Sequence, residues 1–508
     1  MRYATTVEFG DFQTPPDLAT LVCERLAASG TAPASVLEPS AGIGNLFAAA
    51  FERFPSIRSA FAIEINKSYA EKVSSRIAST DSAASVSVVT ADFFSVDLAE
   101  IAEALPDPVL VLGNPPWVTS AALSTIGSSN VPTKVNFKGL SGIEAVTGKS
   151  NFDIAEWFLL RLVNCFAKRR ATIALLCKTS VARSALTHIW RGAMPNPLAR
   201  LYRIDALAAF GASVDACLLV LDFGIAESSG ELCEVYSDLK SELPASAFGL
   251  VGNRLVSNAR VYLSSQSLVT SARGHWRSGV KHDCAAVMEL TVGDRGIVNG
   301  SGDSVLIEPD LVYPLFKATR VFHGEVETTD RRVIVTQNRV GAETSSIALS
   351  APLTWKYLQD NGERLDARKS SIYRGKPRFA IFGVGPYTFS PWKVCISGLH
   401  KELRFRVLGP IDGRPPIVDD TVYFLPANSE EGARLLARLL QSEEATRFFQ
   451  SLVFWDAKRP ITIEILSALD LDRLAERLGT ARPSDADCFY PSPVRPQHQS
   501  DLFAVGSR

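Results

Sequence analysis

The stretch VLVLGNPPW at residues 109–117 contains the most informative part of this sequence. Its four leading apolar residues predict a buried β-strand, and Gly113 predicts the point where that strand breaks. The two prolines remove two N–H donors, so the backbone is stiff and its carbonyls are free to accept hydrogen bonds. Because open α/β sheets bind ligands at the carboxyl ends of their strands, Asn114, Pro115 and Trp117 are expected at such a site. This combination suits a planar ligand that carries an exocyclic amino group; a proline-stiffened surface turn is the alternative.

A glycine-containing segment lies upstream, between a predicted strand and a predicted helix. The sequence EPSAGIG (38–44) follows the short strand-like segment 35–37 and opens a helical pattern at residues 45–54. Glycines in this setting allow a tight turn and a close approach of a ligand to backbone N–H groups. The spacing differs from the GxGxxG of dinucleotide-binding proteins, and no lysine is present to hold a phosphate. Glu38 at its start favours a cationic or hydroxyl-rich ligand.

Two further acidic residues stand at the ends of apolar runs. Glu64 closes the run at 60–63, where a carboxylate can accept hydrogen bonds from both hydroxyls of a ribose. Asp92 follows the run at 86–89 and is placed to accept from an adenine amino group while Phe93 packs on the ring. Each of these acids alone is more often a surface or capping residue. Three acidic residues at successive strand ends, each followed by a helical segment, favour a cofactor pocket.

These segments resemble the motifs of amino-group DNA methyltransferases of the N6-adenine type, which use S-adenosyl-L-methionine. Asn114 to Trp117 is similar to their catalytic (D/N/S)PP(Y/F/W) motif, and EPSAGIG is similar to their cofactor loop. FQTPPD at residues 12–17 resembles a further cofactor motif, and its place at the start of the chain matches the gamma motif order. The resemblance covers residues 12 to about 223 and rests on five motifs in one order. Farther along, residues 276–283 and 366–385 resemble target-recognition regions of gamma-type enzymes from restriction–modification systems.

The resemblance implies a site-specific DNA methyltransferase that transfers a methyl group from S-adenosyl-L-methionine to the N6 amino group of a flipped-out adenine in duplex DNA. Such an enzyme would be the modification enzyme of a type II-like restriction–modification or related defence system. In such an enzyme the N6 amine of the adenine attacks the methyl group in line. Positioning and oriented dipoles then provide most of the acceleration. Three alternatives stay open: an N4-cytosine DNA methyltransferase, a methyltransferase acting on RNA or a protein glutamine, and a DNA-binding module without turnover.

The alternation of apolar runs with helical stretches predicts an α/β fold with a sheet covered on both faces. The resemblance makes this a class I, Rossmann-like methyltransferase domain with a doubly wound, mostly parallel seven-stranded sheet. The expected strands span residues 35–38, 60–64, 86–90, 109–113, 172–177, 201–206 and 216–223. The last two are expected to form an antiparallel pair. The expected divisions are a catalytic domain at 1–235, a mixed α+β target-recognition domain at 236–480, and an extended or disordered tail at 481–508. Residues 118–150 predict a long loop beside the site.

The resemblance also carries individual roles onto this sequence. The catalytic residues it implies are Asn114, Pro115, Pro116 and Trp117. The cofactor-binding residues it implies are Thr14, Glu38, Ser40, Ala41, Gly42, Gly44, Glu64, Ile65, Asp92, Phe93 and Asn114. A target base must leave the duplex to be methylated, and Trp117 and Phe210 are expected to stack on it. Asn151 or Asp153 matches a family motif after the long loop, or caps the helix predicted at 154–166.

The net charge of −1 argues against a DNA-binding protein, because affinity for duplex DNA comes largely from phosphate contacts. The distribution of charge answers this objection. Residues 313–406 contain 16 Lys and Arg against 8 Asp and Glu. The residues expected to contact DNA within this segment are Arg368, Lys369, Arg374, Lys376 and Arg378. An ordinary solvated surface is the alternative interpretation.

Composition places further bounds on the protein. A chain of 508 residues is long enough for two or three domains. It has no apolar stretch of the roughly 20 residues that cross a bilayer and no signal-peptide pattern, so a cytoplasmic protein is expected. Eight cysteines without a CxxC pair favour neither disulfides nor zinc, and the cluster at 281–284 is a weak metal candidate, so no metal is expected. Double-stranded DNA is the expected partner, and a separate restriction endonuclease is a further one, since the sequence has no clear nuclease cluster.

Overall fold

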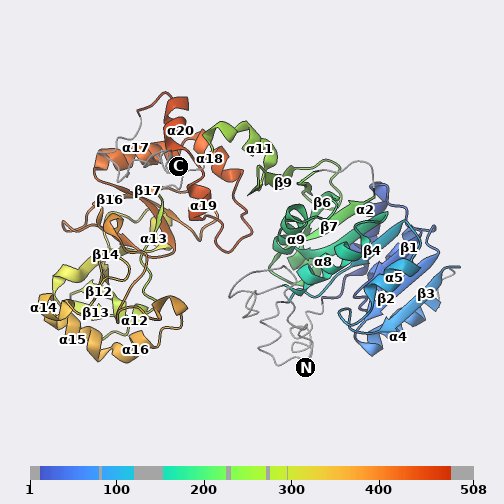
Figure 1. The fold of residues 1–508 in the computed structure, drawn as a ribbon, viewed down its shortest axis with the longest axis horizontal. Helices are drawn as coiled ribbons and strands as arrows, with labels where there is room; N and C mark the ends of the chain where they lie inside the picture. Colours follow the sequence, from blue (N-terminus) through green and yellow to red (C-terminus); the bar gives the residue numbers. More distant parts are fainter. Residues whose placement is uncertain are drawn as a thin grey trace, which may run out of the picture. The chain divides into compact units, whose positions relative to one another are not determined.

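The computed structural model describes residues 12–78, 83–118, 153–224, 230–270, 275–294 and 296–481. The chain divides into two compact units, Met1–Arg260 and Val261–Arg508 (Figure 1). The first unit contains one ten-stranded sheet, and the second contains two smaller sheets. The predicted long loop lies outside the described residues except for Val118, and so do Asn151 and the predicted tail beyond Ala481.

Seven strands of the first sheet begin and end within three residues of the bounds that the apolar runs predict. They are β1 (Ser35–Glu38), β2 (Ser59–Glu64), β3 (Ser85–Thr90), β4 (Val109–Gly113), β5 (Ala171–Lys178), β6 (Leu198–Asp205) and β7 (Asp215–Phe223). Their order across the sheet is β6-β7-β5-β4-β1-β2-β3. Strand β7 is antiparallel to β5 and β6, and the pairs from β5 to β3 are parallel. The carboxyl ends of β1, β2, β4 and β5 therefore meet at one edge of the sheet.

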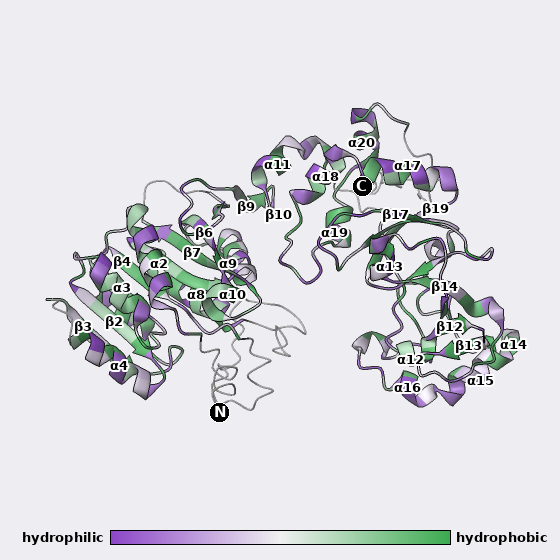
Figure 2. Ribbon diagram, turned by 180° about the vertical axis from the view of Figure 1, so that it is seen from behind, coloured by the Kyte–Doolittle hydropathy of each residue, from purple (hydrophilic) through white to green (hydrophobic). Residues whose placement is uncertain are grey.

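Helices cover both faces of this part of the sheet (Figure 1). They are α2 (Pro16–Ala28), α3 (Asn45–Arg53), α4 (Lys67–Ala78), α5 (Leu98–Ala104), α8 (Ile154–Phe166) and α9 (Thr179–Arg191). Helices α2, α3 and α4 share one hydrophobic cluster with the sheet, and α8 contacts both α5 and α9 on the other face. Strands β1 and β4 are buried along their whole length, as parallel strands covered on both faces are. Figure 2 shows much of this sheet in the hydrophobic colour.

The first sheet has ten strands, so the predicted number of seven is too low. Strand β8 (Leu232–Tyr236) runs parallel to β6, and β9 (Ser246–Val251) and β10 (Arg254–Val256) continue the sheet in antiparallel pairing. Without β8, strand β6 would leave a row of unpaired backbone groups at the sheet edge. The domain boundary expected at residue 235 therefore falls inside a sheet, and the two units divide after Arg260. The short helix α10 (Ala206–Phe210) connects β6 to β7.

The second unit consists of two sheets with short helices around them. One sheet has the order β13-β12-β15-β14-β18, and the other has the order β11-β19-β16-β17. The strands are β11 (Arg277–Ser278), β12 (Glu289–Gly293), β13 (Gly296–Asn299), β14 (Val312–Phe316), β15 (Arg331–Ile334), β16 (Trp392–Ser397), β17 (Arg406–Leu408), β18 (Ile417–Val418) and β19 (Val422–Ala427). All pairs are antiparallel except β14 with β18.

Helices pack against these sheets and connect their strands. The α-helices are α11 (Ala259–Ser264), which spans the division between the units, α12 (Ala285–Met288), α13 (Ala318–His323), α14 (Ile347–Ser350), α15 (Pro352–Asp360), α16 (Gly362–Asp366), α17 (Glu430–Leu440), α18 (Glu443–Gln450), α19 (Ile463–Leu466) and α20 (Leu471–Arg477). The 3₁₀ turns are η1 (Gln266–Leu268), η2 (Pro309–Leu311), η3 (Ser371–Tyr373) and η4 (Pro386–Phe389). Helix α17 packs on β16, β17 and β19. Its amino end is capped by the hydroxyl of Ser429, which accepts from the N–H of Gly432.

Candidate active site

Asn114 lies directly after β4, and its side chain is held in one orientation. The Nδ2 atom donates to the carbonyl oxygen of Phe12 at 2.7 Å and to Oγ1 of Thr14 at 3.3 Å. The Oδ1 atom is buried and has no hydrogen-bond partner among the described residues. A buried polar atom without a partner costs free energy and needs an explanation. Both donors of the amide are thus used within the protein, and its acceptor is left for a ligand.

Trp117 is fixed beside Asn114 by contacts with β5. Its side chain is buried, and its Nε1 donates to the carbonyl oxygen of Leu176 at 3.3 Å. Its own carbonyl oxygen accepts a hydrogen bond from Nζ of Lys178 at 2.9 Å. Two residues of one strand therefore hold the tryptophan at both its ring and its backbone.

The structure places the rings of Trp117 and Phe210 in direct contact. Their ring centroids are 5.0 Å apart and the planes meet at 73°, so the rings contact edge to face. They therefore do not form parallel walls around a gap. A base can enter between them only after the two rings separate. Phe12 completes the cluster, with its centroid 5.6 Å from Trp117 and 6.2 Å from Phe210. Phe12 had no predicted role of its own, and its place as the first residue of the FQTPPD motif was the available signal.

Glu38 ends β1 and is one of the most buried acids in the first unit. Glu38 is 2% exposed, and its Oε2 atom has no hydrogen-bond partner among the described residues. Burial and the nearby carboxylate of Glu64 raise the pKa of Glu38 well above its ordinary value, although a backbone hydrogen bond from Phe47 lowers it. Such a carboxyl group gains most from a ligand that brings a positive charge or hydrogen-bond donors.

The loop after Glu38 has the backbone geometry that its glycines predict. Gly42 and Gly44 have positive φ angles of 55° and 80°, which side chains rarely adopt. The Oγ atom of Ser40 is buried and has no partner among the described residues. Gln13, which sequence reasoning passed over, accepts a hydrogen bond at its Oε1 from the N–H of Ile43 at 3.0 Å. Ala41 is buried, and its N–H donates to a β2 carbonyl at 3.0 Å.

Glu64 ends β2 and joins it to this loop. Its two carboxylate oxygens accept from the backbone N–H groups of Gly42 at 2.7 Å and Asn66 at 2.8 Å. A carboxylate has about four lone-pair sites, so one such group can accept hydrogen bonds from several donors. The next residue, Ile65, is a large apolar side chain that is 46% exposed. An exposed apolar side chain beside an oriented carboxylate suits a ligand with a flat ring and hydroxyl groups.

Asp92 and Phe93 follow β3, and each makes a contact within the protein. Asp92 is exposed, and its Oδ1 accepts from the N–H of Phe94 at 2.9 Å. Phe93 is buried and stacks on Phe158, with centroids 4.1 Å apart and planes 12° from parallel. One face of Phe93 is therefore covered by α8, and a ligand ring has access to the other face at most. The sequence could not reveal this stacking because Phe158 is 65 residues away in the chain.

Asp153 serves as the cap of α8, which was one of its two predicted roles. Its Oδ1 accepts from the N–H of Ala155 at 3.2 Å. Its Oδ2 lies 2.6 Å from Nζ of Lys178, the last residue of β5. Lys178 was not predicted as a site residue; the only signal was a charged side chain at the end of an apolar strand.

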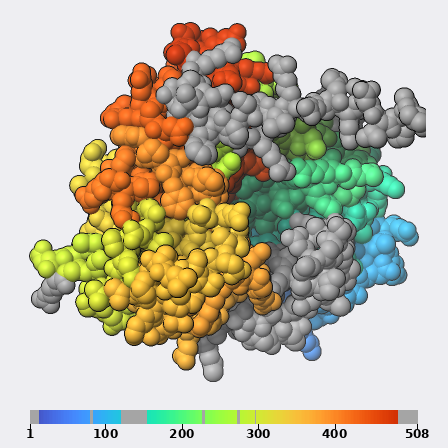
Figure 3. Space-filling model, turned by 60° about the vertical axis from the view of Figure 1, so that its left-hand side comes forward, coloured from blue at the N-terminus to red at the C-terminus, as the bar shows by residue number. Residues whose placement is uncertain are grey.

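The five basic residues predicted to contact DNA fall into three groups. Lys369, Arg374 and Lys376 are exposed. Arg368 is instead a structural residue. Its guanidinium donates to backbone carbonyl oxygens, including that of Ala380 at 2.7 Å, and lies 3.8 Å from the centre of the Tyr373 ring. Arg378 is exposed but forms an ion pair with Asp366 at 2.8 Å. The segment that contains them lies between α16 and β16, within the yellow and orange part of the surface in Figure 3.

Two residues of the cluster at 281–284 already lie beside acidic partners. His282 lies 3.4 Å from Glu289, and Lys281 lies 3.6 Å from Asp283. Among the described residues there is no group of three or more His, Cys, Asp or Glu side chains placed to hold a metal ion. Within the same part of the chain, no helix has both the length and the apolar character of a membrane span.

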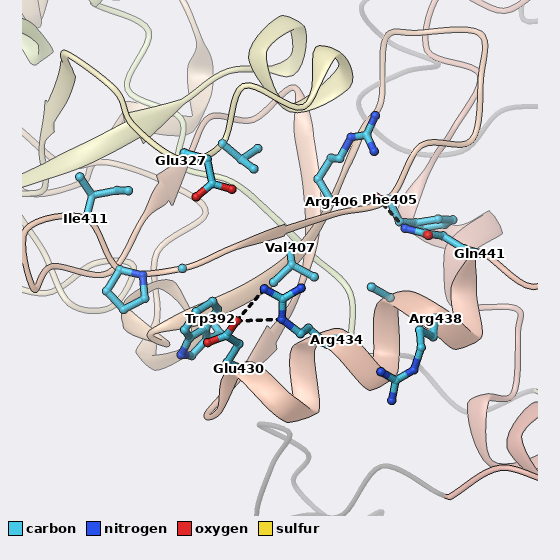
Figure 4. Close-up of a pocket in the computed structure, with 14 residues that line it drawn as sticks. Glu327, Trp392, Phe405, Arg406, Val407, Ile411, Glu430, Arg434, Arg438 and Gln441 are labelled. Atoms are coloured by element: carbon cyan, nitrogen blue, oxygen red, sulfur yellow. Dashed lines mark hydrogen bonds and ion pairs between the residues drawn. The ribbon is translucent and has the colours of Figure 1, made fainter.

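The second unit contains a pocket of about 550 Å³ that is lined in part by residues of β17 and α17 (Figure 4). Its charged lining residues are Glu327, Arg406, Glu430, Arg434 and Arg438. Arg434 is already paired with Glu430 at 2.7 Å, and in the close-up Arg438 points away from the other labelled side chains. None of the residues predicted from the sequence lines this pocket, so it adds nothing to the site around Asn114.

Comparison with known proteins gives the family. No family model matches the chain. Among solved structures, the type IIL restriction-modification enzyme MmeI in complex with DNA is 12% identical, with a TM-score of 0.46 over 92% of this chain and 65% of that chain. A type I restriction-modification methyltransferase subunit from Streptococcus thermophilus is 14% identical, with a TM-score of 0.31 over 44% and 47% of the two chains. The type II methyltransferase M.NspV from Nostoc sp. is 42% identical over 474 residues, which are 93% of this chain and 98% of that protein. At this identity over nearly the whole length of both proteins, the chain belongs to the family of type II methyltransferases.

Proposed function

We propose that this chain is a site-specific DNA methyltransferase that uses S-adenosyl-L-methionine to methylate the N6 amino group of adenine in duplex DNA. It would be the modification enzyme of a restriction–modification system, with a separate endonuclease as its counterpart, and would work in the cytoplasm beside the DNA. The observation that carries the proposal is the buried Oδ1 of Asn114, which has no partner among the described residues. The printed name of M.NspV supports the methyltransferase part of this proposal.

The residues around Glu38 fit S-adenosyl-L-methionine. Glu38 and Ser40 each present a buried oxygen without a partner among the described residues, and these suit the ammonium and hydroxyl donors of such a molecule. Glu64 would accept from the ribose hydroxyls, while the exposed Ile65 would cover the adenine ring of the cofactor. Asp92, which is exposed, would accept from the amino group of that ring. When bound, this cofactor supplies an electrophilic methyl group on a sulfonium.

Asn114 and Pro115 would prepare the target amine for reaction. The lone pair of an adenine amino group is delocalised into the ring, which makes it a poor nucleophile. Hydrogen bonds from the two amino hydrogens to Oδ1 of Asn114 and to the carbonyl of Pro115 would draw the nitrogen towards a tetrahedral geometry. The fixed amide orientation means that no reorganisation is needed at the moment of reaction, which is how oriented dipoles accelerate a step. A strong general base is not required, because the methylated amine loses its extra proton easily.

The aromatic cluster would receive the target base. Adenine N6 is out of reach inside a duplex, so the base must be flipped out and stacked on side chains. Trp117 would form one wall, since β5 holds its ring and backbone. Phe210 would form the other after moving from its edge-to-face contact; it is the last residue of the short helix α10 and is followed by Gly211, which has a positive φ of 67°. Phe12 is packed against both rings and would have to yield as well.

The base that is methylated provides the test of this function. After incubation of the protein with duplex DNA and S-adenosyl-L-methionine, we expect enzymatic digestion and mass spectrometry to detect N6-methyladenine. Sequencing that reads modified bases, on DNA from cells expressing the chain, would then identify one recognised site. N4-methylcytosine as the product would contradict the target base, since both amines suit the same tetrapeptide. Methylated RNA or protein without methylated DNA would contradict the substrate class.

Lys369, Arg374 and Lys376 are proposed to contact DNA phosphates, because all three are exposed cations in one segment. Replacing the three with alanine is expected to weaken DNA binding and to flatten its salt dependence by up to about one unit of slope per lost contact. A matched control replaces Lys356, Arg434 and Arg447 with alanine. This control removes the same charge, but each of its three cations is paired with an acid four residues away. Fluorescence anisotropy over a series of salt concentrations measures both slopes. Equal slopes for the two triple variants would refute this DNA surface.

A further inference from the structure

We propose that Lys178 is a positioning residue for methyl transfer, which it supports by fixing the backbone carbonyl of Trp117. This inference rests on the proposed function. Lys178 has no contact with the proposed reacting atoms that would make it a catalytic residue. Its ammonium group instead joins the catalytic tetrapeptide, the end of β5 and the start of α8 at one point.

The contacts of Lys178 are short and chemically matched. Its Nζ donates to the carbonyl oxygen of Trp117 at 2.9 Å and to Oδ2 of Asp153 at 2.6 Å. A second link joins the same two chain segments, because the N–H of Ile154 donates to the carbonyl oxygen of Val118 at 3.0 Å. Trp117 and Asp153 are 36 residues apart in the sequence, so Lys178 makes one fixed point from two distant parts of the chain.

This fixed point restrains the ring of Trp117 as well as its backbone. The indole Nε1 donates to Leu176, two residues before Lys178 on β5. The two preceding prolines have no N–H groups with which to anchor the tetrapeptide. The orientation of the ring therefore depends on β5 through two hydrogen bonds, one to each side of the tryptophan. Loss of the Lys178 bond would leave the backbone on this side of Trp117 held only through Val118, by its hydrogen bond from the N–H of Ile154.

The electrostatic setting makes the contact stronger than a surface ion pair. The side chains of Lys178 and Asp153 are 23% and 11% exposed. Burial raises the pKa of Asp153 above its ordinary value, although the hydrogen bond from Lys178 lowers it. Removing only the ammonium would leave a buried carboxylate without its partner, which is destabilising in itself. A double variant, Lys178→Met with Asp153→Asn, avoids that side effect, since asparagine also caps helices well.

The test compares four variants with the wild type: Lys178→Met, Lys178→Arg, the double variant, and Lys168→Met as a control at an exposed lysine in the same unit. Three quantities are measured: the rate of methyl transfer at saturating DNA and cofactor, the Kd for S-adenosyl-L-methionine, and the thermal midpoint. A fourth is the fluorescence of a duplex with 2-aminopurine at the target position, which reports how the flipped base is stacked.

We expect Lys178→Met and the double variant to lower the transfer rate by about 10- to 100-fold, because a misplaced reacting group costs that much. The Kd for the cofactor should stay within about twofold, Lys178→Arg should recover most of the rate, and Lys168→Met should match the wild type. The 2-aminopurine signal of the double variant should differ from that of the wild type.

The proposal is overturned if the double variant folds and transfers methyl groups at the wild-type rate. It is also overturned if the rate falls only in proportion to the folded fraction, because Lys178 would then serve stability alone. Wild-type protein without any methyl transfer would instead contradict the proposed function. The ratio of variant to wild-type rates does not depend on whether adenine or cytosine is methylated, so failure of the target-base proposal is distinguishable from failure of this one.

Discussion

Replacing Asn114 with alanine is expected to lower the rate of methyl transfer by about two to three orders of magnitude, the loss found when one oriented dipole is removed from an active site. The structural reason is that Oδ1 is buried without a partner among the described residues, while Nδ2 is bound to Phe12 and Thr14. The substitution removes the acceptor and leaves the pocket around Glu38 and Glu64 intact. Single-turnover assays with labelled cofactor measure the rate, and calorimetry should give a nearly unchanged cofactor affinity.

Two further variants sharpen the interpretation of this result. Asn114→Asp loses the donor to the carbonyl of Phe12 but keeps an acceptor at the same position. Because of this acceptor, it should retain more activity than the alanine variant. Asn164→Ala changes an exposed asparagine on α8 and should behave as the wild type. Near-normal turnover by Asn114→Ala would mean that polarisation of the amine by this side chain is wrong.

The sheet of the first unit was predictable because its strands are short apolar runs separated by helical patterns. The run before Asn114 is buried at all five positions of β4, and the predicted bounds of α8 are those observed. Strands β8 to β10 escaped prediction for a physical reason. They extend the sheet at its edge, where pairing depends on the exposed backbone of β6 more than on a characteristic side-chain pattern.

The site was predictable to the extent that motifs carry local geometry. The positive φ angles of Gly42 and Gly44, and the position of Glu64 at the end of β2, follow from the strand–loop–helix pattern. The contacts between side chains did not follow from it. Lys178 reaches Trp117 only because β4 and β5 are neighbours in a parallel register, and the stacking of Phe93 depends on where α8 crosses the sheet.

The predicted DNA surface illustrates the same limit of sequence patterns. A run of basic residues identifies a charged segment, but it does not distinguish cations that face solvent from those that hold the segment together. Arg368 and Lys369 are adjacent in the sequence, yet the first lies over the ring of Tyr373 and the second is exposed. This difference depends on the path of the chain around η3, which the composition of the segment does not determine.

Replacing Lys393 with methionine is expected to stabilise the protein at neutral pH by about 3 kcal/mol. Lys393 lies in β16 and is fully buried; its Nζ donates to the carbonyl oxygen of Ser390 at 2.7 Å and lies 5.5 Å from the ring of Phe424. Burial lowers the pKa of Lys393 to about 7 from its ordinary value of 10.5. Since each pH unit between the two values corresponds to about 1.4 kcal/mol, the charged form costs on the order of 4 kcal/mol at pH 7. Loss of the single hydrogen bond to Ser390 offsets about 1 kcal/mol of this gain.

The pH dependence identifies the cause of this stabilisation. Between about pH 7 and pH 10.5 the unfolded chain binds the lysine proton and the folded protein does not, so the stability of the wild type should rise with pH through that window. Below about pH 7 both states bind the proton, and the contribution stays constant at its least favourable value. The methionine variant lacks both this term and the hydrogen bond to Ser390, so its advantage should fall with rising pH and become a deficit of about 1 kcal/mol near pH 10.5. Urea denaturation at a series of pH values measures the difference, with Lys401→Met as the control at an exposed lysine of the same unit. A difference between variant and wild type that does not change with pH would show that packing, and not the buried charge, accounts for the result.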